Sequence, residues 1–306
     1  MIRLEGLTKK WPGAARAAVK DVTLEVPEGS CCALIGPSGC GKTTTLRMVN
    51  RLVEPTAGCV WIAGEDALRQ DPVLLRRRIG YVIQEVGLFP HRSIAENVAT
   101  VPVLLGWDAT RIQARVAEVL ERVGLPPARF ADRRPHELSG GERQRVGVAR
   151  ALAGDPPVLL MDEPFGAVDP LRRRQLQDEV LKLLRELGKT VLLVTHDVGE
   201  AMRLGDAVAI LRDGALVQHA PPAELLARPV DAFVADFLGT DRALTRLGLF
   251  PASVARGDAA AAGAPLPERA TLRDALSQML ARGARSVPLE GGGSVSLDAV
   301  LERAAT

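Results

Sequence analysis

The apolar and polar positions of this chain fall into patterns that predict strands covered by helices. Residues 1–11 and 19–30 alternate in the manner of sheet strands, whereas "CCALIG" (31–36) is a short, continuous apolar run. Similar runs occur in "PVLLMDEP" (157–164) and "TVLLVTHD" (190–197). Such runs are typical of strands that are buried on both faces of a parallel sheet.

Helical patterns separate these runs. They occur in "TTTLRMVNRL" (43–52), "LRRRQLQDEVLKLLRELG" (171–188) and "VGEAMRLG" (198–205), and Asp213 and Gly214 predict a hairpin turn. An apolar helical stripe marks "TRIQARVAEVLERVGL", within a mainly helical interval. We therefore expect an α/β fold with a mostly parallel sheet core, an antiparallel N-terminal β part and a helical subdomain at about 92–150.

The pattern changes after about residue 240. "PASVARGDAAAAGAPLPE" is rich in Ala, Pro and Gly and predicts a linker. Beyond it, Thr271 is a suitable cap for a helix that stops at Gly283, and a hairpin around the glycine run and a short helix would close the chain. We expect one domain over 1–240, a linker over 241–270 and a small α+β tail over 271–306.

Composition narrows the class of protein. The 306 residues are 47% hydrophobic and 25% charged, as in a soluble globular protein, and the net charge of +2 does not suggest a nucleic-acid binder. The four cysteines lie between Cys31 and Cys59 without metal-binding spacing, so we expect reduced thiols in the cytosol. We identify neither a signal peptide nor an apolar run of 18 residues, so a role in transport would require a partner that supplies the pore.

The strongest chemical signal is "GPSGCGKT" (36–43), between a predicted strand and a predicted helix. This is the spacing of a P-loop, whose glycines let backbone N–H groups converge on phosphate oxygens at a helix N-terminus. Lys42 is predicted to reach the β- and γ-phosphates of a nucleotide, and the Thr43 hydroxyl is predicted to ligate Mg²⁺. A fortuitous glycine-rich turn would not require the strand, the lysine, the threonine and the helix together.

Polar side chains end three other predicted strands. Asp162 and Glu163 end one, His196 ends another, and Gln84 ends "RRIGYVIQ". Because ligands bind at the carboxyl ends of parallel strands, we expect these groups near the P-loop. Asp162 suits an Mg²⁺ carboxylate, Glu163 a group that polarises the attacking water, and His196 a group that contacts the γ-phosphate or the water. The Gln84 amide would bind Mg²⁺ or water, although one amide alone is a weak signal.

A second candidate phosphate site lies in "LSGGERQR" (138–145). Ser139 is a suitable N-cap, and the helix start at Gly140 and Gly141 would offer N–H groups and a positive dipole end to an anion. The same residues suit an ordinary capped surface helix equally well. The residues alone leave both interpretations open.

Together these motifs resemble the ATP-binding subunit of an ABC transporter over residues 1 to about 240. "GPSGCGKT" resembles its Walker A motif, "LSGGERQR" its signature and "VLLMDEP" its Walker B motif. Gln84 is similar to the Q-loop glutamine, Asp169 to the D-loop aspartate and His196 to the switch histidine. The resemblance implies a P-loop NTPase fold, ATP and Mg²⁺ as cofactors, and a catalytic set that comprises Lys42, Gln84, Glu163 and His196.

In that family two such domains stack head to tail, and each ATP lies between the P-loop of one and the signature helix of the other. The resemblance therefore implies a homodimer in which the two phosphate sites of one chain serve different nucleotides. The implied ATP contacts are Trp11, Gly36, Pro37, Ser38, Gly39, Cys40, Gly41, Lys42, Thr43, Thr44, Ser139, Gly140, Gly141 and Asp169. The implied Mg²⁺ ligands are Thr43, Gln84 and Asp162.

This sequence departs from the family pattern at three places. Trp11 replaces the tyrosine on which adenine usually stacks, and a larger ring can still stack. "GAVD" replaces the commoner "SALD" but keeps Asp169, and Gly199 stands where the family often has an acidic residue. The residues provide no physical account of Gly199.

A narrower resemblance is to importers of osmoprotectants such as glycine betaine, carnitine or choline, through 81–107 and "RPVDAFVADFLGTDRAL". Members of that group often continue into paired cystathionine-β-synthase-type (CBS) repeats, and the tail here resembles at most one shortened unit. The resemblance implies transmembrane permease subunits, with a groove over "EVGLFPHRSIAENV" for their coupling helix, and a periplasmic or lipid-anchored solute-binding protein. It also implies a peripheral position on the cytoplasmic face of the inner (plasma) membrane.

Three alternatives remain. The first is an importer for another small solute, such as an amino acid or methionine. Methionine importers carry a different regulatory domain at the C-terminus, and sugar or polyamine importers usually carry a longer all-β one. A non-transport ABC ATPase that acts on DNA or ribosomes typically has two P-loops or a long coiled-coil insertion, and this chain shows one P-loop, so no nucleic-acid partner is expected. A catalytically dead nucleotide-binding regulator is disfavoured by the intact Lys42, Asp162, Glu163 and His196.

Overall fold

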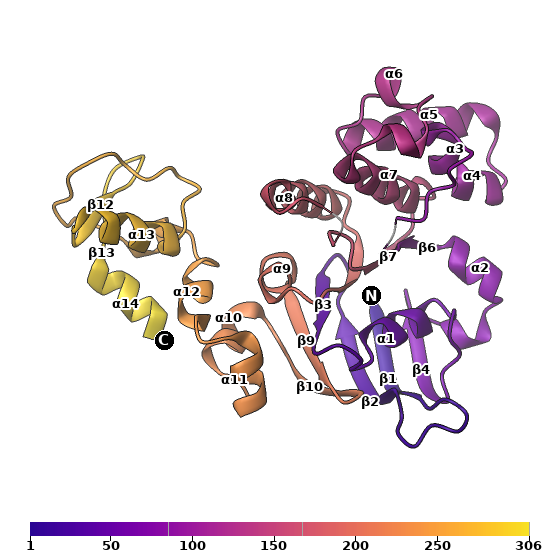
Figure 1. Cartoon of the computed structure of the whole chain (residues 1–306), viewed down its shortest axis with the longest axis horizontal. Coiled ribbons are helices and arrows are strands. Elements are labelled where there is room, and N and C mark those ends of the chain that lie inside the picture. The colour runs from indigo at the N-terminus through magenta and orange to yellow at the C-terminus, as the bar shows by residue number, and fades with distance from the viewer. Residues whose placement is uncertain (85, 167, 306) are drawn as a thin grey trace. The chain divides into compact units, whose positions relative to one another are not determined.

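The computed structural model describes residues 1–84, 86–166 and 168–305 (Figure 1). These residues form two compact units, Met1–His219 and Ala220–Thr306. Within the described ranges, no helix combines the length and the apolar character needed to cross a membrane.

Two sheets form the framework of the first unit. In the described part of the chain, one sheet has the strand order β10-β9-β3-β8-β7-β6, with β3, β6, β7, β8 and β9 parallel, and the other has the antiparallel order β2-β1-β4-β5. Their strands are β1 (Ile2–Lys9), β2 (Val19–Val26), β3 (Cys31–Ile35), β4 (Ala57–Ile62), β5 (Glu65–Asp66), β6 (Ile79–Val82), β7 (Val158–Asp162), β8 (Thr190–Val194), β9 (Ala207–Arg212) and β10 (Ala215–Ala220). The mostly parallel core and the antiparallel N-terminal part are both as expected.

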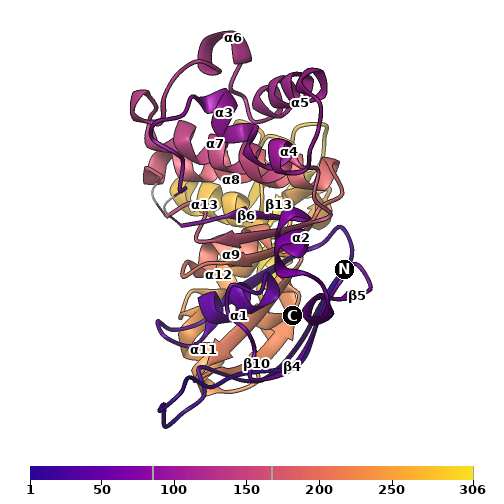
Figure 2. The same ribbon diagram turned by 90° about the vertical axis from the view of Figure 1, so that its right-hand side faces the viewer.

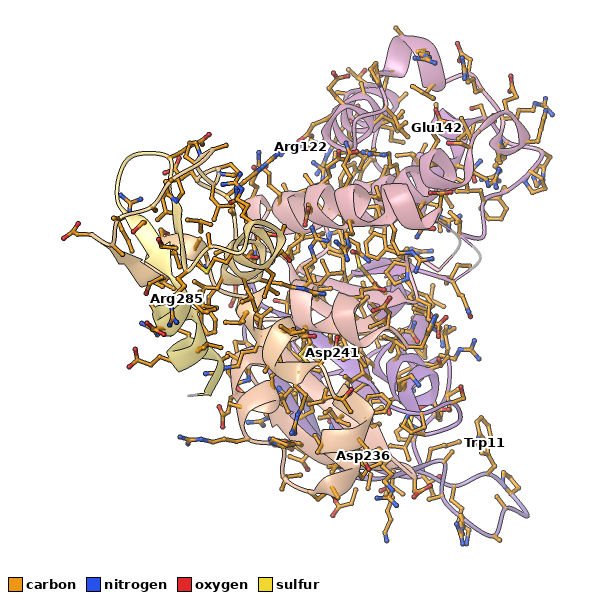
Figure 3. All side chains as sticks on the ribbon, turned by 60° about the vertical axis from the view of Figure 1, so that its left-hand side comes forward. Trp11, Arg122, Glu142, Asp236, Asp241 and Arg285 are labelled. Carbon is orange, nitrogen blue, oxygen red and sulfur yellow. The ribbon has the colours of Figure 1, made fainter. Side chains whose placement is uncertain are left out.

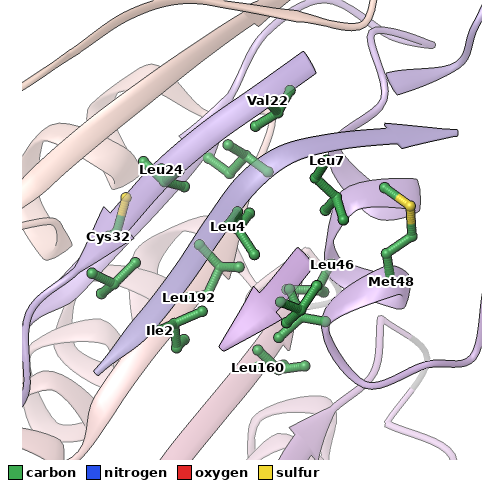
Figure 4. Packing of buried hydrophobic residues seen from close by; sticks show 14 of the residues in the cluster. Ile2, Leu4, Leu7, Val22, Leu24, Cys32, Leu46, Met48, Leu160 and Leu192 are labelled. Atoms are coloured by element: carbon green, nitrogen blue, oxygen red, sulfur yellow. The ribbon is translucent and has the colours of Figure 1, made fainter. Parts of the chain in front are cut away.

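The continuous apolar runs of the sequence became the central strands. All five residues of β3, β7 and β8 are buried, because helices pack against the parallel sheet. The buried side chains of β1, including Ile2, Leu4 and Leu7, join Leu160 and Leu192 of the parallel sheet in one core (Figure 4). Each buried leucine contributes about 1.5–3 kcal/mol, so this shared core fixes the antiparallel part firmly against the parallel sheet.

Helices on the first unit follow the predicted periodicity. The apolar stripe of "TRIQARVAEVLERVGL" buries Val116, Val119 and Leu120 on α5, and α5 and α3 both pack against α7. Figure 2 shows the helical subdomain gathered at one end of this unit, beyond the edge strand β6. The helices are α1 (Lys42–Val49), α2 (Pro72–Arg77), α3 (Ile94–Val98), α4 (Thr100–Leu104), α5 (Ala109–Arg122), α6 (Pro127–Phe130), α7 (Gly140–Ala153), α8 (Pro170–Glu186) and α9 (Val198–Leu204).

The second unit has its own small core and a three-stranded sheet of order β11-β13-β12 among its described residues. Thr271 caps α13 with a reciprocal hydrogen-bonded box, and Gly283 ends it at φ 62°, as predicted. The hairpin around glycines 291–293 and the last helix are also confirmed. Its elements are α10 (Pro222–Ala227), α11 (Ala232–Leu238), α12 (Arg242–Leu247), β11 (Arg256–Gly257), α13 (Leu272–Arg282), β12 (Ser286–Pro288), β13 (Ser294–Ser296) and α14 (Leu297–Ala305).

The segment 241–270, which we expected to be a linker, is instead part of the second unit. It contains α12, and its sparse apolar side chains Leu247, Ala252 and Leu266 are buried in that unit's core. The structure also places the boundary between the units after His219, earlier than the 240 that we expected. The Ala-, Pro- and Gly-rich composition concealed these anchors because they are irregularly spaced and fit neither a helical nor a strand period.

Candidate functional site

The predicted P-loop connects β3 to α1 and is held in place by its own lysine. Lys42 is only 8% exposed, and its Nζ donates hydrogen bonds to the carbonyl oxygens of Gly36 (2.8 Å) and Pro37 (3.0 Å). The buried Cys40 thiol lies 3.8 Å from the same Nζ. The ammonium group therefore sits inside the loop, where the phosphates of a nucleotide would compete for it.

Two glycines of this loop are required by its shape. Gly36 has φ 148°, and a Cβ there would lie 2.1 Å from the carbonyl oxygen of Leu211. Gly41 has φ 103°, and a Cβ there would lie 2.5 Å from the carbonyl oxygen of Ala18. Both contacts are too close for any side chain, so the backbone of neighbouring elements fixes where the loop can run.

Thr43 and Asp162 lie together, as the predicted Mg²⁺ site requires. Thr43 is the second residue of α1 and Asp162 ends β7, and the Thr43 hydroxyl donates to Asp162 Oδ1 at 3.2 Å. Burial raises the pKa of Asp162, while the Thr43 hydrogen bond and the Arg47 guanidinium oppose that rise. Hard oxygen donors of this kind suit Mg²⁺. The described residues contain no cluster of three His, Cys, Asp or Glu side chains able to hold a metal ion.

Glu163 is the point where three strand ends meet. Gln84 Nε2 donates to Glu163 Oε2 at 2.9 Å, and His196 Nδ1 lies 3.2 Å from the same oxygen. We expected Gln84 to be the last residue of its strand. Strand β6 ends at Val82 instead, so Gln84 lies two residues beyond it. The parallel order β6-β7-β8 places these three side chains at one edge of the sheet.

The backbone of Glu163 is strained. Its φ of 46° lies in the left-handed region, which costs a residue with a Cβ about 1–2 kcal/mol. The Glu163 N–H donates to the carbonyl of Val194 at 2.9 Å, and Val194 ends β8, two residues before His196. Strain of this kind is typical of functional positions, where the surrounding structure holds a side chain in one direction.

The signature segment forms a capped helix start. Ser139 precedes α7, its hydroxyl accepts from the Glu142 N–H at 3.3 Å, and Glu142 Oε2 accepts from the Ser139 N–H at 2.7 Å. These hydrogen bonds lower the pKa of Glu142. Ser139 is exposed, so the start of α7 is accessible from outside this chain.

Trp11 and the signature helix lie far apart. Trp11 is 45% exposed on the loop after β1, with Lys9 Nζ 4.7 Å from its ring centroid. Figure 3 shows Trp11 and Glu142 at opposite ends of the first unit. Asp169 is exposed just before α8, and position 167 of "GAVD" lies outside the described residues. The residues that we assigned to ATP therefore form two separate groups.

Two buried polar side chains next to His196 were not singled out from the sequence. Thr195 and Glu200 are 1% and 7% exposed, and they share a hydrogen bond of 3.0 Å. A glutamate in the first turn of a short helix resembles an ordinary surface residue in the sequence. Only the packing of α9 against β3 shows that this one is buried.

Comparison with known proteins agrees with the fold. The family described as ABC transporter matches residues 19–166. The osmoprotectant import ATP-binding protein OsmV of Salmonella typhimurium is 54% identical over 255 residues, which are 82% of this chain and 67% of that protein. The glycine betaine uptake system ATP-binding protein YehX of Escherichia coli is 50% identical over 90% of both chains.

This chain matches only part of the length of several relatives. Among the four OpuCA and OpuBA proteins of Listeria and Bacillus, the match spans 60–63% of their length. A solved dimeric structure of an ATP-binding cassette in a post-hydrolysis state, bound to ADP and Pi, is 35% identical with a TM-score of 0.65 and covers 72% of this chain and 99% of its own. On these similarities, the chain belongs to the ATP-binding cassette ATPases of ABC transporters.

Proposed function

We propose that this chain is the ATP-hydrolysing subunit of an importer, that it works as a head-to-tail homodimer, and that it drives uptake of an osmoprotectant through a separate permease. The observation that carries the catalytic part is the convergence of Gln84 and His196 on one oxygen of Glu163. These three side chains lie at the same edge of the sheet as Asp162, which is hydrogen-bonded to Thr43 of the P-loop.

Each side chain has a role that its position supports. Lys42 would exchange its two loop carbonyls for phosphate oxygens, while the glycine backbone cradles the phosphates. Thr43 and Asp162 would hold Mg²⁺, which supplies neutralisation of charge on the phosphate oxygens when it is bound. Glu163 would orient and polarise the attacking water, and His196 would steady both Glu163 and the γ-phosphate.

The separation of the two phosphate sites supports the dimer. Ser139 presents an exposed, capped helix start at a distance from Trp11, so it is suited to the nucleotide of a second copy. ATP would then join two chains, and hydrolysis would release them, which is a ligand-driven shift between closed and open states. Transmembrane permease subunits and a periplasmic or lipid-anchored binding protein would use that motion, with this chain on the cytoplasmic face of the membrane.

The solute class rests on the relatives. OsmV and YehX are named for osmoprotectant import and glycine betaine uptake. A quaternary amine of this type is therefore the solute that we propose. Reconstitution with the chain's own permease and binding protein tests it, because glycine betaine, carnitine or choline should stimulate ATP hydrolysis. Stimulation by methionine alone would favour the other importer class.

The dimer is tested with Glu163→Gln, which keeps the size of the side chain but removes the charge that polarises water. This variant should bind ATP and elute as a dimer in sizing chromatography with ATP. Its rate of hydrolysis should be lower than that of wild type by on the order of a hundredfold or more. The matched control is Glu186→Gln, an exposed substitution on α8, which should hydrolyse ATP at the wild-type rate. A Glu163→Gln variant that binds ATP yet remains monomeric would refute the shared site.

A further inference from the structure

A buried carboxylate close to His196 in sequence is not among the residues that we assigned to ATP or Mg²⁺. Glu200 is in the first turn of α9 and is 7% exposed. Its Oε2 accepts from the Thr195 hydroxyl at 3.0 Å, and Thr195 Oγ1 in turn accepts from the Asp197 N–H at 3.1 Å. These bonds enclose residues 195–197, with His196 in the middle, in a closed hydrogen-bonded turn.

A positive charge on a second element attracts this carboxylate. Glu200 Oε1 is buried and has no hydrogen-bond partner among the described residues. Among the described residues, Arg173 Nε is also buried without a hydrogen-bond partner. Arg173 belongs to α8, the helix packed against α9, and its positive charge attracts the Glu200 carboxylate. Arg173 is anchored at the start of α8, where its N–H donates to the Asp169 carbonyl and its Nη2 to the Val168 carbonyl.

The titratable groups that interact with Glu200 come from three parts of the chain. Asp197 and His196 lie just before it in sequence, Arg173 belongs to α8, and the Cys31 thiol belongs to β3. Burial is the main cause that raises the pKa of Glu200 to about 7, and Asp197 adds to the rise. The Thr195 hydrogen bond, Arg173 and His196 oppose it. A buried acid that titrates near neutrality is costly unless its ionised form has a use.

We propose that Glu200 is a positioning residue for ATP hydrolysis: its carboxylate holds Thr195, and through that turn it fixes His196 against Glu163. The charge of Arg173, which is hydrogen-bonded beside Asp169, attracts the same carboxylate. This inference rests on the role proposed above for His196. The ionised carboxylate is the effective form, because a charged acceptor binds the Thr195 hydroxyl more strongly than a neutral one and attracts Arg173.

The test is Glu200→Gln in the full-length chain, with steady-state ATP hydrolysis measured from pH 6 to pH 8. Glutamine keeps the shape and an acceptor oxygen but not the charge. At pH 8 its kcat should be about fivefold below wild type, the difference between a charged and a neutral hydrogen bond, with KM for ATP within about twofold. At pH 6 the two rates should converge, because wild-type Glu200 is then mostly protonated.

Two further variants and a control separate the possible outcomes. Thr195→Val removes the hydroxyl that links Glu200 to the turn, and it should also lower kcat and flatten its pH dependence. Glu28→Gln, an exposed substitution on the turn between β2 and β3, should follow wild type throughout. His196→Ala tests the role on which this proposal depends.

The results distinguish the positioning role from the proposed function. If Glu200→Gln has the wild-type kcat at pH 8 while His196→Ala is inactive, the positioning role is overturned and the proposed function stands. Equal loss at pH 6 and pH 8 shows that Glu200 is merely structural and also overturns it. If Glu200→Gln fails to fold, a wild-type pH profile in Thr195→Val refutes the link through the hydroxyl. Full activity of His196→Ala contradicts the role proposed for His196 and, with it, this inference.

Discussion

Replacing Glu200 by glutamine should stabilise the first unit at alkaline pH. The pKa of Glu200 is raised from 4.5 to about 7 in the folded chain, so the folded state retains a proton that the unfolded state loses between those values. Stability from this group is therefore fully present below pH 4.5 and is lost as pH rises to about 7. Glutamine is neutral at every pH and avoids that loss.

The size of the effect follows from the pKa change. At about 1.4 kcal/mol per pH unit, the ionised carboxylate costs about 3 kcal/mol at pH 8, and about 2.5 kcal/mol of this develops between pH 5 and pH 8. The free energy of unfolding of Glu200→Gln, minus that of wild type, should rise by this amount across the interval. Other groups titrate in both proteins, so their contributions cancel in the difference.

Urea unfolding followed by tryptophan fluorescence measures this difference. Trp11, Trp61 and Trp107 all lie in the first unit, so their emission reports on the unit that contains Glu200. Glu28→Gln, whose carboxylate is exposed, should show no comparable rise. A change below about 1 kcal/mol between pH 5 and pH 8 would mean that Glu200 is solvated in solution, and the reasoning from burial would be refuted.

Three other substitutions test the proposed ATP site. Lys42→Ala should weaken ATP binding and slow hydrolysis by on the order of a hundredfold or more, measured by nucleotide fluorescence and phosphate release; wild-type turnover would contradict the P-loop assignment. Ser139→Arg should abolish hydrolysis while the monomer still binds ATP, and loss of binding would place Ser139 in its own chain's pocket. Gly41→Ala should destabilise the loop by about 1–3 kcal/mol in thermal unfolding because its Cβ would meet the Ala18 carbonyl, so an unchanged melting temperature would argue against this loop path.

The sequence predicted those parts of the molecule whose physics is local. Continuous apolar runs gave the buried strands, a 3.6-residue stripe gave α5, and Thr271 and Gly283 marked the ends of α13. The residues at strand ends could be placed together because parallel strands finish at one edge of the sheet. That reasoning predicts that Gln84, Glu163 and His196 lie close together, and the structure places Gln84 and His196 on the same oxygen of Glu163.

Features that depend on packing could not be read in this way. Glu200 is polar and follows a helix cap, and nothing in its sequence neighbourhood shows that β3 and α8 enclose it. The left-handed backbone of Glu163 accompanies a hydrogen bond to Val194, on a strand that follows about thirty residues later. The buried anchors of 241–270 were equally hidden, because the core that they fill is built mainly from later residues.

The bonds from Lys42 to Gly36 and Pro37 have a consequence for how nucleotide arrives and leaves. Immobilising a flexible backbone costs about 1–2 kcal/mol per residue, and a loop already closed on its own lysine has met that cost during folding. Capture of ATP is then an exchange of partners at one ammonium group rather than a disorder-to-order transition. A loop that regains its shape without help after each product departs is ready at once for another cycle.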